Sequence, residues 1–383
     1  MTDALPLAQE LIRCESVTPV DAGALDVLER EVARMGFACT RYPFGEGEHR
    51  VDNLYARKGN ASPNFCFAGH VDVVPPGEAA KWREAPFAAE VRDGMLWGRG
   101  AADMKGAIAA FIAAVERILA SGGDVPGSVS FLITGDEEGP AENGTDKLLD
   151  AVVASGEVID HCLVGEPTNP DRLGTTIKNG RRGSLNAKVT VTGRQGHVAY
   201  PERAKNPVPV MMEFLSRLLA RELDRGNDFF QPSNLEVTSI DVANPAHNVI
   251  PESARAQFNI RFNTEHRGDD LKAWIRDVAA EVEAETGLAI ALDLRVTGEA
   301  FLTEPSPFTA LLQDAVESKT GTRPELSTGG GTSDARYITR VCPVVEFGLV
   351  GATMHQVDER VAVADIATLT DIYEDVLRRY FAA

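Results

Sequence analysis

The sequence predicts an α/β protein that is interrupted by a compact α+β insertion. In the first part of the chain, short apolar runs typical of buried strands alternate with helical patterns, as they do in α/β folds. From about Gly183 to Val296 the elements instead follow the order strand, helix, strand, strand, helix, strand, which is a known compact layer. The 383 residues suffice for two domains. We therefore place one domain at residues 1–182 and 297–383 and the other at residues 183–296.

The elements of the first part follow from apolar periodicity and from the breakers between them. Gly36 ends the second of two amphipathic helices. The segment Met104–Ala120 is rich in small residues and apolar on more than one side, which predicts a buried helix. The expected helices cover residues 7–14, 25–35 and 104–120, and the expected strands cover residues 37–42, 53–57, 65–72, 95–100, 128–134 and 161–165.

The insertion and the end of the chain show clear patterns too. Leu185–Gly193 alternates apolar and polar residues, as a half-exposed strand does. Helices at 208–223 and 270–286 and strands at 235–242, 254–262 and 288–296 complete the insertion. A strand at Val344–Phe347 and a helix at Asp365–Phe381 follow, with Asp365 as the expected N-cap.

The composition excludes several classes of partner. A net charge of −19 disfavours binding to nucleic acid and to anionic membranes, although a few local arginines can still bind an anionic small molecule. The five cysteines show no CxxC pattern, which favours reduced thiols in the cytoplasm over disulfides: 14, 39, 66, 162 and 342. We expect no signal peptide, because the N-terminus lacks a long apolar core, and no membrane span, because no apolar run reaches about 18 residues.

The first candidate for chemistry is the apolar run FCFAGHVD, residues 65–72. In extended backbone the side chains at positions i and i+2 point the same way, so His70 and Asp72 share a face. A metal-binding imidazole is commonly oriented by a nearby carboxylate. A core histidine with a buried aspartate partner is the alternative that this stretch alone leaves open.

Five stretches place metal-type side chains just after an apolar strand or in a loop. They contain His70 and Asp72, Asp103, Glu137 and Glu138, Glu166, and His355. Two histidines with several carboxylates suit zinc or a similar divalent ion. A site for two metals needs one bridging carboxylate and a separate carboxylate as base, and the Glu137–Glu138 pair can divide metal binding and proton transfer between its members. Each motif alone is weak, since paired glutamates are usually surface residues.

Several motifs together resemble the aminoacylase and glutamate-carboxypeptidase family of di-zinc amidohydrolases. The motifs are GHVDVVPPG, GRGAADMKG, TGDEEG, GEPT and ATMHQVDE. The resemblance covers nearly the whole chain and implies a mixed-sheet, aminopeptidase-like catalytic domain. It also implies that the insertion is a ferredoxin-like domain that serves as a lid and forms a homodimer.

The resemblance implies roles for the metal-type residues. Asp103 would bridge two zinc ions, for which cobalt or manganese can substitute. His70 and Glu166 would hold one ion, and Glu138 and His355 the other. Asp72 would orient His70. Where the family often has a second aspartate after the bridging one, with a cis peptide between them, this chain has Met104.

The resemblance also implies an amide hydrolysis. Glu137 would act as general base and then as general acid, and His197 in GRQGHVAYP would donate to the oxyanion, often from the partner subunit. Judged without the resemblance, a histidine in a stretch like that of His197 is more often an ordinary loop residue than an oxyanion donor.

A second set of motifs narrows the expected substrate. These motifs resemble stretches of the family members that remove succinate from N-succinyl-LL-2,6-diaminopimelate in lysine and diaminopimelate biosynthesis. They are KNGRRGSL, HNVIP, NIRFN and LSTGGGTSDARYI. Arginine suits the three carboxylates of that substrate because its planar fork pairs with a carboxylate through two hydrogen bonds. The candidate contacts are Arg181, Arg182, Tyr200, Asn248, Arg261, Thr332 and Arg336.

Three alternatives stay open at this point. An N-acetylornithine deacetylase or a dipeptidase of the same family would use the same metal site. A non-catalytic metal-binding protein is disfavoured because Glu137 and all five expected ligands are present. A nucleotide-binding α/β protein is disfavoured because neither GxGxxG nor GxxxxGK[ST] occurs at a strand-to-helix turn.

Overall fold

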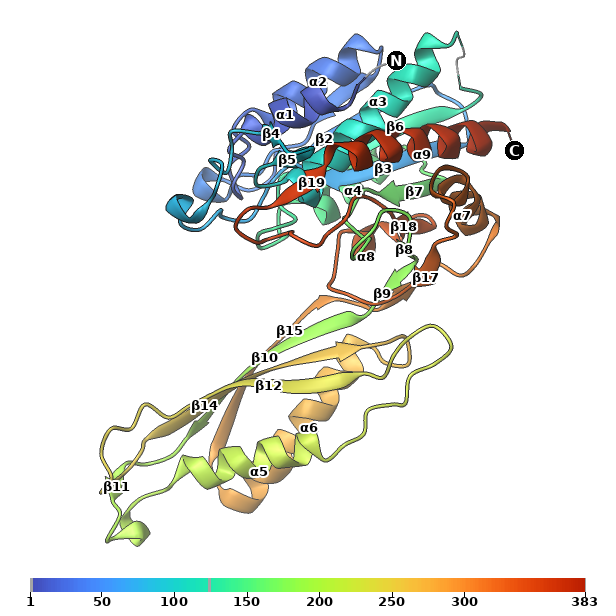
Figure 1. The fold of residues 1–383 in the computed structure, drawn as a ribbon. Coiled ribbons are helices and arrows are strands. Elements are labelled where there is room, and N and C mark those ends of the chain that lie inside the picture. Colours follow the sequence, from blue (N-terminus) through green and yellow to red (C-terminus); the bar gives the residue numbers. More distant parts are fainter. Residues whose placement is uncertain (1–2, 123–124, 383) are drawn as a thin grey trace. The chain divides into compact units, whose positions relative to one another are not determined.

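The computed structural model describes residues 3–122 and 125–382, which form two compact units (Figure 1). The larger unit comprises the described residues within 1–179, 303–327 and 333–383, and the smaller unit comprises residues 180–302 and 328–332. The smaller unit begins at 180 rather than 183 and ends at 302 rather than 296. The reason is a short antiparallel pair that extends it, formed by β9 (Gly180–Arg181) and β16 (Phe301–Leu302).

An eight-stranded mixed sheet forms the centre of the larger unit. Its strands, in spatial order, are β1 (Ala38–Arg41), β2 (Leu54–Lys58), β6 (Ser128–Thr134), β3 (Asn64–His70), β7 (His161–Val164), β18 (Val344–Glu346), β8 (Thr176–Lys178) and β17 (Glu325–Ser327). β3 lies between β6 and β7 and is parallel to both. Every residue of β3 is buried, which explains its continuous apolar sequence, since a parallel strand is covered on both faces.

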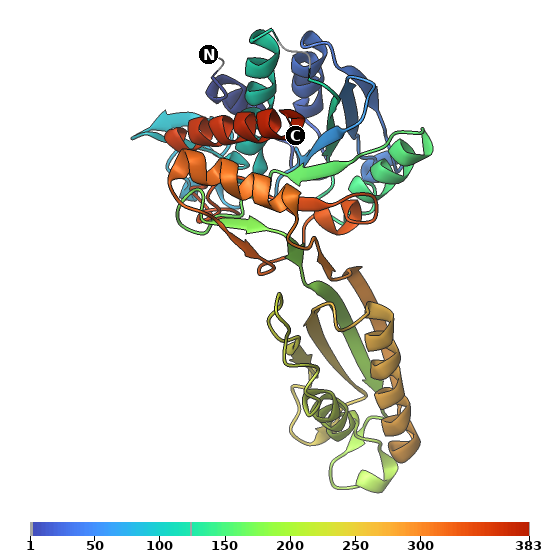
Figure 2. The same ribbon diagram turned by 90° about the vertical axis from the view of Figure 1, so that its right-hand side faces the viewer.

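Helices cover this sheet. They are α1 (Leu5–Arg13), α2 (Ala24–Arg34), α3 (Gly106–Ala120), α4 (Thr145–Ala154), α7 (Pro307–Thr320), α8 (Ala335–Ile338) and α9 (Val363–Ala382). α3 and α9 lie side by side (Figures 1 and 2). The Phe111 ring of α3 stacks on Phe67 of β3 with centroids 4.3 Å apart and meets Tyr373 of α9 at 5.5 Å. The alanines of α3 permit this close packing, and the prediction of a buried helix is confirmed.

Four details of the larger unit differ from the sequence-based prediction. The helix predicted from Met104 begins at Gly106, because Asp103 and Met104 have non-helical backbone angles. Asp365 is not an N-cap: α9 begins at Val363, so Asp365 lies in the first turn, where an acidic side chain still favours the helix dipole. The helices α4, α7 and α8 and the strands β8 and β17 were not predicted. A small three-stranded sheet also forms, from β4 (Glu90–Arg92), β5 (Met95–Trp97) and β19 (Arg360–Ala362).

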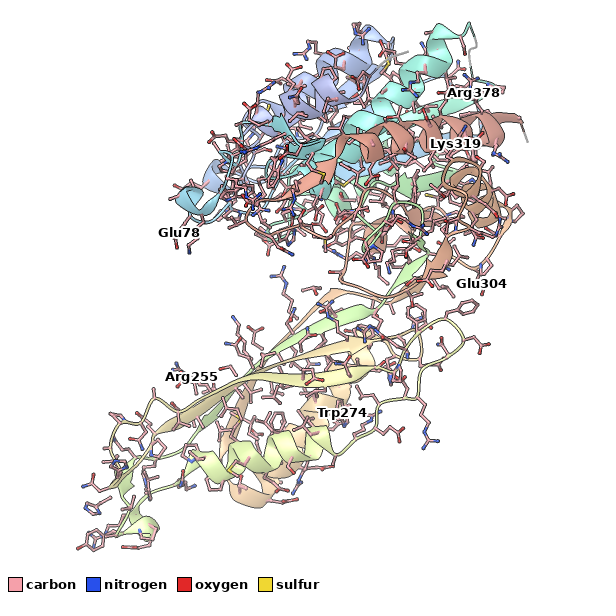
Figure 3. All side chains as sticks on the ribbon, viewed as in Figure 1. Glu78, Arg255, Trp274, Glu304, Lys319 and Arg378 are labelled. Atoms are coloured by element: carbon pink, nitrogen blue, oxygen red, sulfur yellow. The ribbon has the colours of Figure 1, made fainter. Side chains whose placement is uncertain are left out.

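The smaller unit is an antiparallel sheet with two helices on one face. In spatial order the strands are β12 (Asn234–Asp241), β14 (Ser253–Phe262), β10 (Gly183–Thr192) and β15 (Ala289–Gly298), and the helices are α5 (Pro207–Leu219) and α6 (Gly268–Thr286). Alternate residues of β14 are buried against the helices, whereas Arg255 points to the opposite face (Figure 3). Figure 3 also marks Trp274 on α6, which stacks with Arg221. A two-stranded ribbon, β11 (Gly196–His197) with β13 (Val249–Ile250), completes the unit.

All five cysteines are free. Among the described residues, no helix combines the length and the apolar character needed to cross a bilayer.

Candidate metal centre

Polar residues gather at one edge of the larger sheet, where three parallel strands end. His70 is the last residue of β3, and Asp72 follows it by two residues. The loop after β6 carries Glu137 and Glu138, and Glu166 follows the end of β7 by two residues. Parallel strands bring their carboxyl ends to the same edge of a sheet. The topology thus brings together residues that lie almost a hundred positions apart in the sequence.

The first group of candidate ligands consists of His70, Asp103 and Glu166. The Nε2 atom of His70 lies 3.1 Å from Asp103 Oδ1 and 3.8 Å from Glu166 Oε1. The His70 ring is buried, and its Nδ1 lies 2.9 Å from the backbone oxygen of Asp72. In the neutral ring Nδ1 must carry the proton in order to donate it to this carbonyl, so the lone pair of Nε2 faces the carboxylates.

The second group consists of Asp103, Glu138 and His355. The Nε2 atom of His355 lies 2.8 Å from Glu138 Oε1 and 3.3 Å from Asp103 Oδ2. His355 belongs to the loop between β18 and β19 and adopts a left-handed φ of 63°, which is uncommon for a residue with a side chain. Asp103 lies in the irregular turn Ala101–Lys105 before α3, and the peptide bond from Asp103 to Met104 is cis.

Asp103 is common to both groups. Its Oδ1 faces His70 and its Oδ2 faces His355. One carboxylate with an oxygen in each of two ligand groups is the arrangement that a bridging ligand requires. Two imidazoles and three carboxylates also form a donor set that fits zinc and similar divalent ions. The residues present therefore fit two metal ions about one shared carboxylate.

The electrostatics of the centre also favour the binding of cations. Burial, and next the charge of Asp103, raise the pKa of Glu166 well above its ordinary value. Burial also opposes ionisation of Asp103, but the hydrogen bonds from His355 and His70 outweigh it and hold the pKa of this carboxyl low. Hydrogen bonds to Asp103 and Glu138 raise the pKa of His355 to about 10. The clustered carboxylates thus favour positive charge beside them, which a bound cation can supply.

Comparison with known proteins identifies the family. The model of peptidase family M20/M25/M40 matches residues 66–379. The chain belongs to this family. A relative from Maricaulis maris, named succinyl-diaminopimelate desuccinylase, is 64% identical over 381 residues, covering 100% of this chain and 96% of the relative. A relative of the same name from Caulobacter vibrioides is 60% identical over 382 residues, covering 100% and 97%.

Solved structures confirm the fold. An M20 family metallo-carboxypeptidase from Sulfolobus solfataricus matches with a TM-score of 0.80 at 16% identity, covering 100% of both chains. A dinuclear metal binding peptidase of the M20 family from Bacillus subtilis matches with a TM-score of 0.72 at 14% identity, covering 99% of this chain and 98% of that one. The predicted α/β fold with an inserted domain and the predicted family are both confirmed.

Glu137 lies beside the two groups that share Asp103 without belonging to either. It forms a third set of candidate ligands with His70 and Glu138. Burial, and next the negative charge of Asp334, raise the pKa of Glu137 well above its ordinary value. The Nη1 atom of Arg336 lies 4.0 Å from Glu137 Oε1 and favours the ionised form. A carboxyl that is only 12% exposed and under such opposing influences is suited to accept and return a proton.

The contacts of Asp72 differ from the prediction. The backbone oxygen of Asp72, not its carboxylate, makes the short contact to His70, and Oδ1 is 3.7 Å away from the ring nitrogen. The carboxylate instead accepts hydrogen bonds from the backbone nitrogens of Glu137 (3.2 Å) and Glu138 (3.0 Å) and from the Thr18 hydroxyl (2.6 Å). Asp72 thus ties the strand end that carries His70 to the loop that carries both glutamates.

Most of the predicted substrate contacts lie in the smaller unit. Arg336 belongs to the larger unit, whereas the following residues belong to the smaller one: Arg181, Arg182, His197, Tyr200, Asn248, Arg261 and Thr332. His197 is exposed on β11, and its Nδ1 accepts a hydrogen bond from the backbone nitrogen of Ala199 at 3.1 Å. The other ring nitrogen, Nε2, therefore carries the proton in the neutral ring.

Arg182 and Arg261 form a cationic pair on the smaller unit. Burial, and next the charge of Arg261, lower the pKa of Arg182. Burial also lowers the pKa of Arg261. Arg182 Nη1 donates to the side-chain oxygen of Asn234 at 3.0 Å, and its Nε is buried without a hydrogen-bond partner. Two partly desolvated guanidinium groups that repel each other favour an anionic ligand.

Sequence reasoning missed three polar residues that support the centre. Thr18 holds Asp72, and a buried pair of Arg99 and Glu359 contacts the turn of Asp103. Arg99 precedes the Asp103 motif in GRGAAD, and Glu359 ends the motif of His355. Charged residues next to ligand motifs are the signal that could have found this pair. Thr18 lies 54 positions from Asp72 and gives no comparable signal.

Proposed function

We propose that this chain hydrolyses N-succinyl-LL-2,6-diaminopimelate to succinate and LL-2,6-diaminopimelate, a step of lysine and diaminopimelate biosynthesis. One observation carries the amide-hydrolase part: Asp103 turns one oxygen to each of two histidine–carboxylate groups, with Glu137 beside them. The choice of substrate rests on two full-length relatives at 64% and 60% identity that are named for this activity.

The proposed cofactor is a pair of zinc ions. His70 and Glu166 would hold one ion, Glu138 and His355 the other, and Asp103 both. Cobalt and manganese fit the same donor set. When bound, the ions would lower the pKa of a water toward about 7 and polarise the scissile carbonyl.

Glu137 is the proposed general base. Its carboxylate accepts the proton of the attacking water at Oε1 and later returns it to the nitrogen of the leaving amine. Asp72 supports this role by holding the backbone of residues 137 and 138. His197 is the proposed oxyanion donor through Nε2–H, supplied by the partner subunit of a homodimer.

The proposed substrate carries three carboxylates. We assign Arg182 and Arg261 to the recognition of one carboxylate, because they are the cationic pair described above. Arg336 is a third candidate, with its guanidinium beside Glu137. Arg181, Tyr200, Asn248 and Thr332 remain proposed contacts on the smaller unit.

The smaller unit is the proposed lid and dimerisation domain. β12 lies at the edge of its sheet, with its outer backbone groups available for pairing with another strand. Ile240 of β12 is 60% exposed. A second copy of the chain would cover this edge.

We place the protein in the cytoplasm. Support comes from the five free cysteines, since proteins of oxidising compartments commonly pair theirs.

A substrate panel tests the proposed reaction. Zinc-loaded protein is offered N-succinyl-LL-2,6-diaminopimelate, N-acetylornithine and several dipeptides, with a parallel sample treated with chelator. We expect strong preference for the succinyl compound and loss of activity on chelation. Preference for N-acetylornithine or a dipeptide would keep the metal centre but overturn the substrate assignment. No turnover of any compound by protein with two bound zinc ions would favour a non-catalytic metal-binding protein.

A further inference from the structure

We infer that Glu359 and Arg99 are positioning residues that hold two proposed metal ligands, Asp103 and His355, at a fixed separation. This inference rests on the proposed metal centre and adds the residues that set its geometry. Neither side chain belongs to the ligand groups, and both are buried, with side-chain exposures of 0% for Glu359 and 3% for Arg99.

Glu359 holds the backbone of the turn that carries Asp103. Its Oε1 accepts hydrogen bonds from the backbone nitrogens of Ala102 at 2.9 Å and Asp103 at 3.2 Å. The turn is irregular, with non-helical backbone angles at Asp103 and Met104. Backbone donors at such an entry to a helix need acceptors from elsewhere, and Glu359 supplies one.

Arg99 connects Glu359 to the loop of His355. Its Nη1 donates to Glu359 Oε2 at 2.5 Å. Its Nη2 lies 3.5 Å from the backbone oxygens of both His355 and Pro75. The guanidinium also lies over the ring of Trp82, 5.3 Å from its centroid. One ion pair therefore touches the backbone of Asp103 at one end and that of His355 at the other.

The topology explains why these residues meet. β5 pairs with β19, so that Trp97 lies opposite Arg360, and the backbone nitrogen of Gly98 donates to the oxygen of Glu359 at 2.9 Å. Arg99 follows β5 by two residues, and Glu359 directly precedes β19. The segment that leads into Asp103 and the segment that leads out of His355 are thus joined where β5 pairs with β19.

A contribution to folding stability does not by itself explain why Arg99 and Glu359 form a buried ion pair. Burying two opposite charges costs desolvation that their attraction often only offsets, and apolar residues of similar volume are frequently as stable. The Nε atom of Arg99 is in addition buried without a hydrogen-bond partner. Contact with the backbone of two proposed ligands is what distinguishes this pair from an apolar contact in the same place.

The two proposed metal ions should depend on the pair to different degrees. His355 is the most exposed of the proposed ligands, with 47% of its side chain accessible, and Arg99 contacts the backbone of its loop. His70 is buried at the end of a central strand and is oriented by the backbone oxygen of Asp72. Disrupting the pair should therefore weaken the Glu138–His355 ion more than the His70–Glu166 ion.

Zinc titration of metal-free protein tests this inference. We compare wild type, Glu359→Gln and Glu157→Gln by calorimetry and elemental analysis. Wild type should bind two ions, and Glu359→Gln should bind one normally and the other about 10- to 100-fold more weakly, as mutations around metal ligands commonly do. Glu157→Gln is the matched control, because it disrupts the partly buried Arg57–Glu157 pair, which contacts no proposed ligand. It should bind both ions as wild type does.

A second variant covers the case in which Glu359→Gln fails to fold. Arg99→Lys keeps the positive charge opposite Glu359 but replaces the two guanidinium nitrogens that contact Glu359 and the His355 oxygen with a single ammonium group. It should show the same selective loss of one ion. If the folded variants bound both ions at wild-type affinity, this inference would be wrong but the proposed metal centre would stand. Fewer than two ions bound by wild type would overturn the proposed metal centre, and the inference with it.

Discussion

The proposed metal centre and the arginine pair of the smaller unit differ in how firmly their side chains are held. Asp103 is buried, contacts two histidines and has its backbone nitrogen bound by Glu359. Arg182 and Arg261 are partly exposed, and the charge of Arg261 disfavours that of Arg182. In the first region Asp103 is held by protein partners, whereas in the second region the Nε atom of Arg182 has no hydrogen-bond partner, which leaves capacity that an anion could fill.

This difference suits the two tasks that we assign. Bond cleavage requires ligands and base at fixed distances, so buried strand ends and backbone contacts are appropriate for it. Recognition of a charged substrate requires cations whose partners arrive with the substrate. Changes in the first region should therefore affect turnover and metal binding, and changes in the second should affect substrate affinity.

Removing the proposed base should have the largest effect. Glu137→Ala should keep both zinc ions and lower kcat by about 10²- to 10⁴-fold, because only the proton transfer is removed. The measurement combines zinc content with steady-state kinetics on the succinyl substrate. Hydrolysis at a near wild-type rate would refute the assignment of the base, and loss of zinc would show that Glu137 is a ligand instead.

Weakening the support of the base should have the next largest effect. Asp72→Asn leaves one oxygen but turns an amide group toward the backbone nitrogen of Glu137 or Glu138. We expect kcat to fall about 10- to 100-fold with little change in KM, the usual range for such supporting contacts. Thr18→Val serves as a milder comparison, since it removes one of the hydrogen bonds to Asp72. A raised KM with unchanged kcat would place Asp72 in substrate binding.

Replacing an arginine of the cationic pair should change KM rather than kcat. Arg261→Met should lower kcat/KM for the succinyl substrate roughly 10- to 100-fold, mainly through KM, because a charge-assisted hydrogen bond contributes about 1.5–3 kcal/mol. N-acetylornithine, which has fewer carboxylates, should be affected less. Arg255→Met is the matched control, since Arg255 lies on the same strand and the same face, opposite Thr190 instead of Ser184. Equal effects of both variants would remove the special role of Arg261.

The smallest predicted effect concerns the stability of the smaller unit at low pH. Burial opposes ionisation of Asp224, but hydrogen bonds from Ser233 and Gly226 outweigh it and lower the pKa of Asp224 to about 2. The unfolded value is about 3.9, so the ionised side chain stabilises the fold above about pH 4, and this contribution is lost as the pH falls to about 2. Its size is roughly 2 kcal/mol.

Hydrogen exchange of β14 can measure this contribution in wild type and Asp224→Asn. The difference in opening free energy between the two proteins should be largest at pH 5 and should shrink as the pH falls toward 2. A difference that stays constant with pH would show that the charge of Asp224 does not stabilise the unit.

The sequence predicted the fold class, and it pointed to candidate ligands that the structure brings close together, because both depend on local signals. His70 ends an apolar strand, Glu137 and Glu166 lie two or three residues past the ends of two others, and parallel strands must end at one edge of a sheet. α6 shows a similar local pattern and was predicted from Asp270, two residues after its observed start at Gly268. Signals of this kind need no knowledge of distant contacts.

Features that depend on distant contacts were missed, and so was one local signal. α7 begins with a capping box between Ser306 and Thr309, a signal that was present but was not used. The pairing of Arg99 with Glu359 spans 260 positions and arises only when β5 meets β19. The contacts of the Asp72 carboxylate likewise depend on where the loop after β6 lies, which the spacing of residues cannot show.

The most direct test of the account is zinc binding by Asp103→Ala, because the account depends on one carboxylate that serves two ions. Metal-free wild type, Asp103→Ala and His355→Ala are titrated with zinc, and folding is checked by circular dichroism. We predict two ions for wild type, one tightly bound ion for His355→Ala, and neither ion at wild-type affinity for Asp103→Ala. If folded Asp103→Ala retained one ion at wild-type affinity, Asp103 would belong to a single site and the shared centre would be wrong.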